Sequence, residues 1–156
     1  MQPAGDNPEI REAGIRDVIT GEGVVITLPS NVYECTIGEG SFVGPFCEIQ
    51  KKVIVGKFCR IQSHSFICEG VTLGDHCFIG HGVMFINDTF SSGGPAGGDQ
   101  SKWRKTVIGN HVSIGSNATI LPVSICDNVV IGAGAVVTKD IQEAGTYAGN
   151  PAERLK

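Results

Sequence analysis

The chain has few aromatic residues and no long apolar run. Aromatic side chains make up 6% of its 156 residues, and only one is tryptophan. No apolar stretch approaches the roughly 20 residues that a membrane-spanning helix needs, and no secretory signal is recognisable. We therefore expect a cytoplasmic protein without a membrane partner. The net charge of −4 lacks the basic excess of a nucleic-acid-binding domain, so nucleic acid is not an expected partner either.

Aliphatic residues recur at nearly every sixth position. This period fits neither an amphipathic helix nor an alternating strand, but it fits a solenoid in which each hexad is one flat side with its aliphatic residue pointing inward. The series slips by one residue near Pro122, where a hexad has only five residues. The inward column comprises Ile37, Val43, Ile49, Val55, Ile61, Ile67, Leu73, Ile79, Phe85, Ile108, Ile114, Ile120, Ile125, Ile131 and Val137.

Two further columns follow the same period. The fifth residue of a hexad is small or β-branched, and cysteines alternate there with Ser, Ala and Val, which favours buried, reduced thiols. Cys59 and Cys77 are one coil apart, a spacing that also permits a disulfide. The second residue is often glycine, which we expect to provide the tight or left-handed backbone of the corners. These glycines are Gly38, Gly44, Gly56, Gly74, Gly80, Gly109, Gly115 and Gly132.

The three columns resemble those of the hexapeptide-repeat acyltransferases, which are left-handed parallel β-helices. The resemblance implies one all-β domain, a triangular solenoid, and it alone supplies the handedness. We expect a projecting loop where the period breaks, because insertions of this length are usually functional or disordered. The expected parts are a lead-in over 1–17, a first coil block over 19–85, the loop over 86–107, a second block over 108–141, and a tail over 142–156 that leaves the β-helix at Gly145 and ends in a short helix or irregular chain.

The closing stretch VVIGAGAVVTKDI…YAGNPAERL is similar to the terminal motif of that family. The resemblance implies acetyl-CoA as co-substrate, no metal, and a homotrimer with its sites in the clefts between subunits. Small residues would let the backbone face the pantetheine arm, and basic side chains would pair with phosphates. The expected contacts are Ser116, Gly132, Ala133, Gly134, Lys139 and Arg154.

Histidines are candidates for acid–base chemistry near neutral pH. His81 is the third residue of its hexad, just before the loop, where related sugar acyltransferases often have a catalytic histidine. The alternative is a corner histidine that is hydrogen-bonded to a neighbouring coil. His64, about one coil earlier, is a candidate for substrate contact, whereas His76 and His111 are expected to be exposed corner residues.

Asn87 and Asp88 follow Phe85 at a place where some antibiotic-modifying members of the family have Asn-His, and that histidine deprotonates a hydroxyl. Asp88 favours an amine acceptor instead, because an amine needs positioning and proton removal more than strong activation. Asn87 would orient the amine or stabilise the oxyanion. The stretch GHGVMFIND and the repeats after the loop resemble N-acetyltransferases of dTDP- or UDP-linked 3-amino sugars for surface polysaccharides. We therefore expect His81, Asn87 and Asp88 to be catalytic in a direct attack on the thioester.

The loop holds the only tryptophan, Trp103, beside Arg104 and two lysines. Stacking on the indole and neutralisation of a diphosphate would bind the nucleotide sugar. Alternatively, Trp103 anchors the loop against a neighbouring subunit.

Three other functions are open. They are O-acetylation of a sugar or other small hydroxyl acceptor, a non-catalytic scaffold, and a γ-type carbonic anhydrase. The anhydrase would need His76, His81 and His111 as zinc ligands, although these histidines differ in their phase within the repeat.

Overall fold

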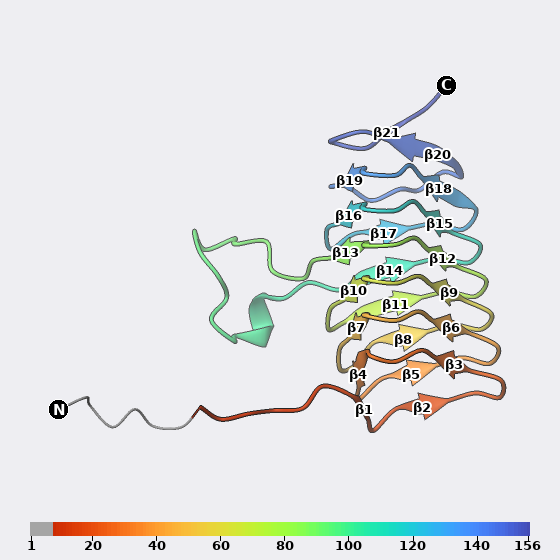
Figure 1. The fold of residues 1–156 in the computed structure, drawn as a ribbon. Coiled ribbons are helices and arrows are strands. Elements are labelled where there is room, and N and C mark those ends of the chain that lie inside the picture. Colours follow the sequence, from red (N-terminus) through yellow and green to blue (C-terminus); the bar gives the residue numbers. More distant parts are fainter. Residues whose placement is uncertain (1–7) are drawn as a thin grey trace.

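The computed structural model describes residues 8–156, which wind into a parallel β-helix with a single projecting loop (Figure 1). Three sheets, here named A, B and C, form the three sides of the coil. Their strands are parallel except for the last, and successive strands fall on successive sheets up to residue 137. The predicted all-β solenoid is therefore confirmed. Residues 1–7 of the predicted lead-in lie outside the described residues. Within residues 8–156, no helix has the length and apolar character needed to cross a bilayer.

Each sheet is a ladder of very short strands, most of them two residues long. Sheet A consists of β1 (Ile15–Arg16), β4 (Asn31–Tyr33), β7 (Glu48–Ile49), β10 (Phe66–Ile67), β13 (Met84–Phe85), β16 (Thr119–Ile120) and β19 (Val136–Val137). Sheet B consists of β2 (Ile19–Thr20), β5 (Thr36–Ile37), β8 (Ile54–Val55), β11 (Val71–Leu73), β14 (Thr106–Ile108) and β17 (Ser124–Ile125). Sheet C consists of β3 (Val25–Ile26), β6 (Phe42–Val43), β9 (Arg60–Ile61), β12 (Phe78–Ile79), β15 (Ser113–Ile114), β18 (Val129–Ile131), β20 (Gly145–Ala148) and β21 (Glu153–Arg154).

Strand register confirms the expected coil length and the slip. Phe66 pairs with Glu48, eighteen residues earlier, which is three hexads. Ser124 pairs with Val107, only seventeen residues earlier, so the five-residue hexad lies between them. The register therefore absorbs the shortened hexad without losing the inward phase of the column.

The core is the lumen of the β-helix. Every aliphatic residue of the predicted inward column is at most 2% exposed, and the cysteines of the fifth position are at most 4% exposed. All six cysteines are free thiols. Aliphatic side chains stacked through consecutive coils fill this lumen, and their burial contributes about 25 cal/mol per Å² of apolar surface.

The second-position glycines are needed for a different reason from the one predicted. None of them has a positive φ; the left-handed residue of each corner lies two positions later, for example Phe58, His76 or His111. A Cβ on Gly38 would instead lie 2.6 Å from the carbonyl carbon of Gly56 in the next coil. The glycine column is therefore required by the close approach of coils.

Both ends of the β-helix extend further than expected. Ile15 and Arg16 already pair with Val32 and Tyr33, so sheet A begins inside the predicted lead-in. At the other end the chain does not leave the β-helix at Gly145. Instead, β20 pairs with β18 in parallel, and β21 folds back against β20 as an antiparallel hairpin. A hairpin that covers the last coil satisfies strand edges which a free tail would leave open.

Candidate functional site

Each coil has three corners, named here by the sheets that they join. The A–B corner includes residues 50–53, 68–70 and the loop 86–105. The B–C corner includes 56–59, 74–77 and 109–112, and the C–A corner includes 62–65, 80–83, 115–118 and 132–135. Most of the side chains predicted to be functional lie at the A–B and C–A corners.

The loop begins after β13 and returns at β14, at the A–B corner (Figure 1). Its base is closed by the backbone N–H of Arg104, which donates to the Asn87 carbonyl at 3.1 Å. Its one helical turn, η1 (Gln100–Lys102), has Asp99 as N-cap. The loop therefore has a defined fold of its own.

Asp88 organises this loop. Its two carboxylate oxygens accept the backbone N–H of Ala96 at 2.7 Å and that of Phe90 at 3.0 Å. These bonds, chiefly the one from Ala96, hold the pKa of Asp88 below its usual range. A carboxylate occupied by its own loop and with a lowered pKa is poorly suited to accept a proton, so the geometry favours a structural role over the expected catalytic one.

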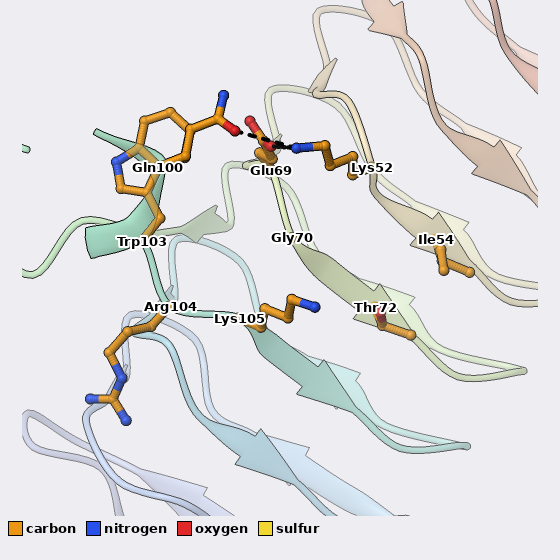
Figure 2. Close-up of a pocket in the computed structure, with 9 residues that line it drawn as sticks. All are labelled: Lys52, Ile54, Glu69, Gly70, Thr72, Gln100, Trp103, Arg104 and Lys105. Atoms are coloured by element: carbon orange, nitrogen blue, oxygen red, sulfur yellow. Dashed lines mark hydrogen bonds and ion pairs between the residues drawn. The ribbon is translucent and has the colours of Figure 1, made fainter. Parts of the chain in front are cut away.

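Between the loop and the coil lies a pocket of about 340 Å³ (Figure 2). Its floor comes from strands β8 and β11 and from the corner before β11, and its wall comes from η1 and the residues after it. The lining residues are Lys52, Ile54, Glu69, Gly70, Thr72, Gln100, Trp103, Arg104 and Lys105.

Glu69 is the buried charge of this pocket. It is 8% exposed, and its Oε1 lies 2.6 Å from Lys52 Nζ, while Oε2 lies 3.8 Å from Lys51 Nζ. Lys52 also donates to Gln100 Oε1 at 3.4 Å, which connects the coil to η1. A buried carboxylate must be compensated by partners, and here the partners are surface lysines that reach inward.

The pocket is cationic although the chain as a whole is acidic. Lys52, Arg104 and Lys105 line the pocket together with a single carboxylate, that of Glu69, in a chain of net charge −4. Trp103, Gln100 and Glu69 line this pocket together, and in Figure 2 the Arg104 guanidinium points away from Glu69. The predicted pair Trp103 and Arg104 therefore does line one pocket.

Asn87 is hydrogen-bonded to the backbone of Glu69. Its Nδ2 donates to the Glu69 carbonyl oxygen at 3.3 Å, and from the other side Gln50 Oε1 accepts the Glu69 N–H at 3.1 Å. Glu69 is not among the site residues predicted from the sequence, although the length of the coil gives a signal for it. Lys51, Glu69 and Asn87 are eighteen residues apart, so the coil length alone places them in one column.

The C–A corner holds the predicted histidines. The ring nitrogen Nδ1 of His81 lies 2.9 Å from Ser63 Oγ, and the backbone N–H of His81 donates to Ser116 Oγ at 3.2 Å. His64 stacks on Phe46 with ring centroids 4.9 Å apart. Both histidines are exposed and one coil apart. His81 is thus both hydrogen-bonded to neighbouring coils, as the alternative expected, and open to a ligand.

The residues predicted to bind the cofactor divide among three places. Ser116, Gly132, Ala133 and Gly134 follow His81 along the C–A corner, where side chains are small. Lys139 is exposed in the turn after β19, in the segment that leads from sheet A back to sheet B. Arg154 lies in the terminal hairpin, where it pairs with Glu143 at 3.1 Å and donates to the Ala144 carbonyl at 2.9 Å.

The two corners are separated within one chain. His81 lies at the C–A corner and Asn87 at the A–B corner, with strand β13 of sheet A between them. Asn87 and Asp88 are therefore at a different corner of the coil from His81.

The three histidines of the zinc alternative lie at two different corners. His76 and His111 stack at the B–C corner with ring centroids 4.9 Å apart, but His81 lies at the C–A corner. Within residues 8–156, no three His, Cys, Asp or Glu side chains converge as metal ligands would.

Two segments match known repeat families. The family described as "Hexapeptide repeat of succinyl-transferase" matches residues 105–139, and "Bacterial transferase hexapeptide (six repeats)" matches residues 34–68. Both matched segments lie within the β-helix, and the matches identify its coils there as hexapeptide repeats. A chloramphenicol acetyltransferase from Agrobacterium fabrum is 48% identical over 52 residues, which are 33% of this chain and 25% of that protein. The chain thus spans about a quarter of the length of this relative.

Solved structures resemble nearly the whole chain. An aspartate-to-alanine mutant of AntD, an N-acyltransferase from Bacillus cereus, in complex with dTDP and coenzyme A, superposes with a TM-score of 0.77 and 25% identity, covering 90% of this chain and 83% of that one. PerB from Caulobacter crescentus, in complex with CoA and GDP-perosamine, has a TM-score of 0.64 and 19% identity, covering 88% of this chain and 58% of that one. The latter likeness shows the fold alone.

Proposed function

We propose that the protein transfers an acetyl group from acetyl-CoA to the amine of a dTDP- or UDP-linked 3-amino-deoxy sugar. The observation that carries this proposal is the pocket at the A–B corner, where an indole, three cations and one carboxylate surround a space of about 340 Å³. An indole offers a face for a base or sugar, and the cations complement a diphosphate. The carboxylate complements an amine.

Similar proteins support the two ligands of this proposal. The AntD complex contains dTDP and coenzyme A, and the PerB complex contains CoA and a GDP-linked sugar. Acetyl-CoA is accordingly the proposed co-substrate here. A cytoplasmic location stays a prediction.

The C–A corner suits the pantetheine arm of acetyl-CoA. From His81 onward the third residue of each hexad becomes smaller along the axis, through Ser116 to Ala133. Gly132 and Gly134 flank Ala133, so backbone amides can face a thin ligand there. Arg154 would have to leave its ion pair with Glu143 to bind the phosphates. This pair is exposed and therefore weak.

A homotrimer would bring the two corners together. Because a side of the coil separates them within one chain, the loop and pocket of one subunit need the C–A corner of a neighbour to meet the thioester. We therefore place the reaction in the cleft between subunits, with symmetry generating equal sites.

In this arrangement the amine attacks the thioester directly, without an acyl-enzyme. Burial raises the pKa of the Cys68 thiol, adjacent to Glu69, to about 12, so it is not a nucleophile at neutral pH. His81, held by Ser63, is proposed to lie near the thioester. Asn87 positions Glu69, and Asp88 shapes the loop.

The test is thiol release from acetyl-CoA with a panel of acceptors. The panel contains dTDP-, UDP- and GDP-linked amino sugars, a hydroxyl sugar and chloramphenicol. We expect turnover with a dTDP- or UDP-linked 3-amino sugar. Turnover of a hydroxyl acceptor alone would establish the O-acetyltransferase instead, and absence of both acetyl-CoA binding and turnover would favour the scaffold.

A further inference from the structure

The Glu69 carboxylate is nearly buried, yet only one of its oxygens is fully partnered. Oε1 accepts from Lys52 Nζ at 2.6 Å, whereas Oε2 is 3.8 Å from Lys51 Nζ and makes no hydrogen bond to residues 8–156. A carboxylate has acceptor sites on both oxygens, and within residues 8–156 Oε2 is not one of the fully buried atoms that lack a partner, so it is open to the pocket. Oε2 is therefore a free acceptor on a residue that lines the pocket.

The Glu69 backbone is fixed more firmly than a simple surface ion pair would require. Gln50 holds its N–H from the coil before, and Asn87 holds its carbonyl from the coil after. In contrast, the Lys52 side chain is 64% exposed and the Lys51 side chain 36% exposed. The carboxylate is thus placed by the rigid coils, and the lysines adapt to it, which is the arrangement expected of a binding group.

The surroundings of Oε2 fit an amine donor. The Trp103 indole and the Lys105 stem lie on the loop side of the pocket, and Gly70, with φ +87°, leaves room for Lys105 over the coil. Arg104 and Lys105 make no ion pair within residues 8–156 and can serve a diphosphate, whereas Oε2 of Glu69, the one carboxylate that lines the pocket, can serve the positive end of the substrate. A sugar amine carries that charge, and a sugar hydroxyl does not.

We propose, on the basis of the proposed function, that Glu69 binds the acceptor amine through Oε2 and takes the proton that the nitrogen loses. The bound ammonium first gives one proton to water, and the lone pair of the neutral amine then forms the C–N bond to the thioester carbonyl carbon while the C=O π pair moves to oxygen. The nitrogen of the adduct loses its second proton to Glu69. The carbonyl then re-forms, the C–S bond breaks, and the leaving sulfur takes this proton from Glu69 through water, which gives the amide, free CoA thiol and the Glu69 carboxylate again.

The experiment compares two probes, a dTDP-linked 3-amino-3,6-dideoxyhexose and its 3-hydroxy counterpart, by Trp103 emission and by thiol release. The variants are Glu69→Gln and Glu69→Asp. The control is Glu39→Gln, which changes a carboxylate at the same hexad position of the B–C corner, where it pairs with Lys57 on the surface. We expect Glu69→Gln to lose the preference for the amine and at least 100-fold in kcat/KM, while the Kd of dTDP itself changes less than threefold. Glu39→Gln should behave as the unchanged protein.

The outcomes separate this inference from the proposed function. A Glu69→Gln variant with the original amine preference and kcat/KM would overturn the role of Glu69 and leave the acetyltransferase intact. Failure of the unchanged protein to acetylate any nucleotide amino sugar would overturn the function, and the binding preference would still decide the role of Glu69. Should Glu69→Gln not fold, Glu69→Asp decides: a loss of tenfold or more supports the role, and activity within twofold contradicts it.

Discussion

The B–C and A–B corners use the third residue of the hexad in different ways. At the B–C corner, short polar side chains bind the backbone of the coil before. Asp75 accepts the Lys57 N–H at 2.7 Å, Asn110 accepts the Asp75 N–H at 2.8 Å, and Asp127 accepts the Asn110 N–H at 2.8 Å. At the A–B corner the column is Lys51, Glu69 and Asn87, and Glu69 bonds to lysines in place of the backbone.

The two corners therefore differ in whether the side chain at this position binds a neighbouring coil or is available to a ligand. A side chain that satisfies a neighbouring coil has little capacity left for a substrate. Glu69 is one methylene longer than an aspartate, and its backbone is supported by Gln50 and Asn87, so its carboxylate remains available. The same position in the repeat therefore stabilises the fold at one corner and builds a pocket at the other.

The largest effect is expected from a substitution that disrupts the packing between coils at the B–C corner. Gly38→Ala would place a methyl group 2.6 Å from the Gly56 carbonyl carbon, so the coils must separate. We expect a loss of about 3 kcal/mol in the free energy of unfolding, measured by urea denaturation. The control is Gly94→Ala in the loop, where a Cβ meets nothing within 4 Å. It should change stability by less than about 0.5 kcal/mol, and equal losses in both variants would contradict the distinction.

A smaller effect separates the corners by function. Trp103→Ala removes the indole from the pocket and should raise the KM for the nucleotide sugar about tenfold or more, since stacking contributes about 1–3 kcal/mol per base. His111→Ala at the B–C corner removes a ring stacked on His76 and should leave kcat and KM within twofold. Steady-state thiol release measures both, and an unaltered KM in Trp103→Ala would show that the ring only anchors the loop.

The smallest effect concerns the loop and depends on pH. Because the folded pKa of Asp88 is lowered, its two bonds are intact above the ordinary carboxyl pKa of about 3.9 and are lost as the pH falls through the lower folded value. Hydrogen exchange at the Ala96 amide should therefore stay slow from pH 7 to about 4, after correction for intrinsic rates. Asp88→Ala should exchange fast throughout, and indistinguishable protection in the two proteins would rule out this role.

Much of the fold follows from the sequence because the repeat is so regular. The aliphatic column predicts the lumen at every position tested, and Pro122 marks the shortened hexad that the register of Val107 and Ser124 shows. The glycine column was predicted in the correct places for the wrong reason, since close contact between coils depends on three-dimensional spacing. The terminal hairpin was missed because β20 pairs with β18 outside the hexad period.

The candidate site was less predictable because it depends on corners. The sequence predicts His81 and Asn87 as members of one catalytic set, although a whole side of the coil lies between them. Trp103 and Arg104 were found from their residue types alone. Glu69 was overlooked because a single acidic residue in a hexad gives no signal until the eighteen-residue coil places it between Lys51 and Asn87.

The most direct measurement of the central claim is the emission of Trp103, the only tryptophan of the chain, during titration with dTDP, UDP and GDP. Binding in the pocket at the A–B corner predicts a saturable change in emission that weakens as salt is raised, because the cations of the pocket bind the diphosphate. Calorimetric binding of a nucleotide diphosphate with no change in Trp103 emission would place the nucleotide elsewhere and contradict the account.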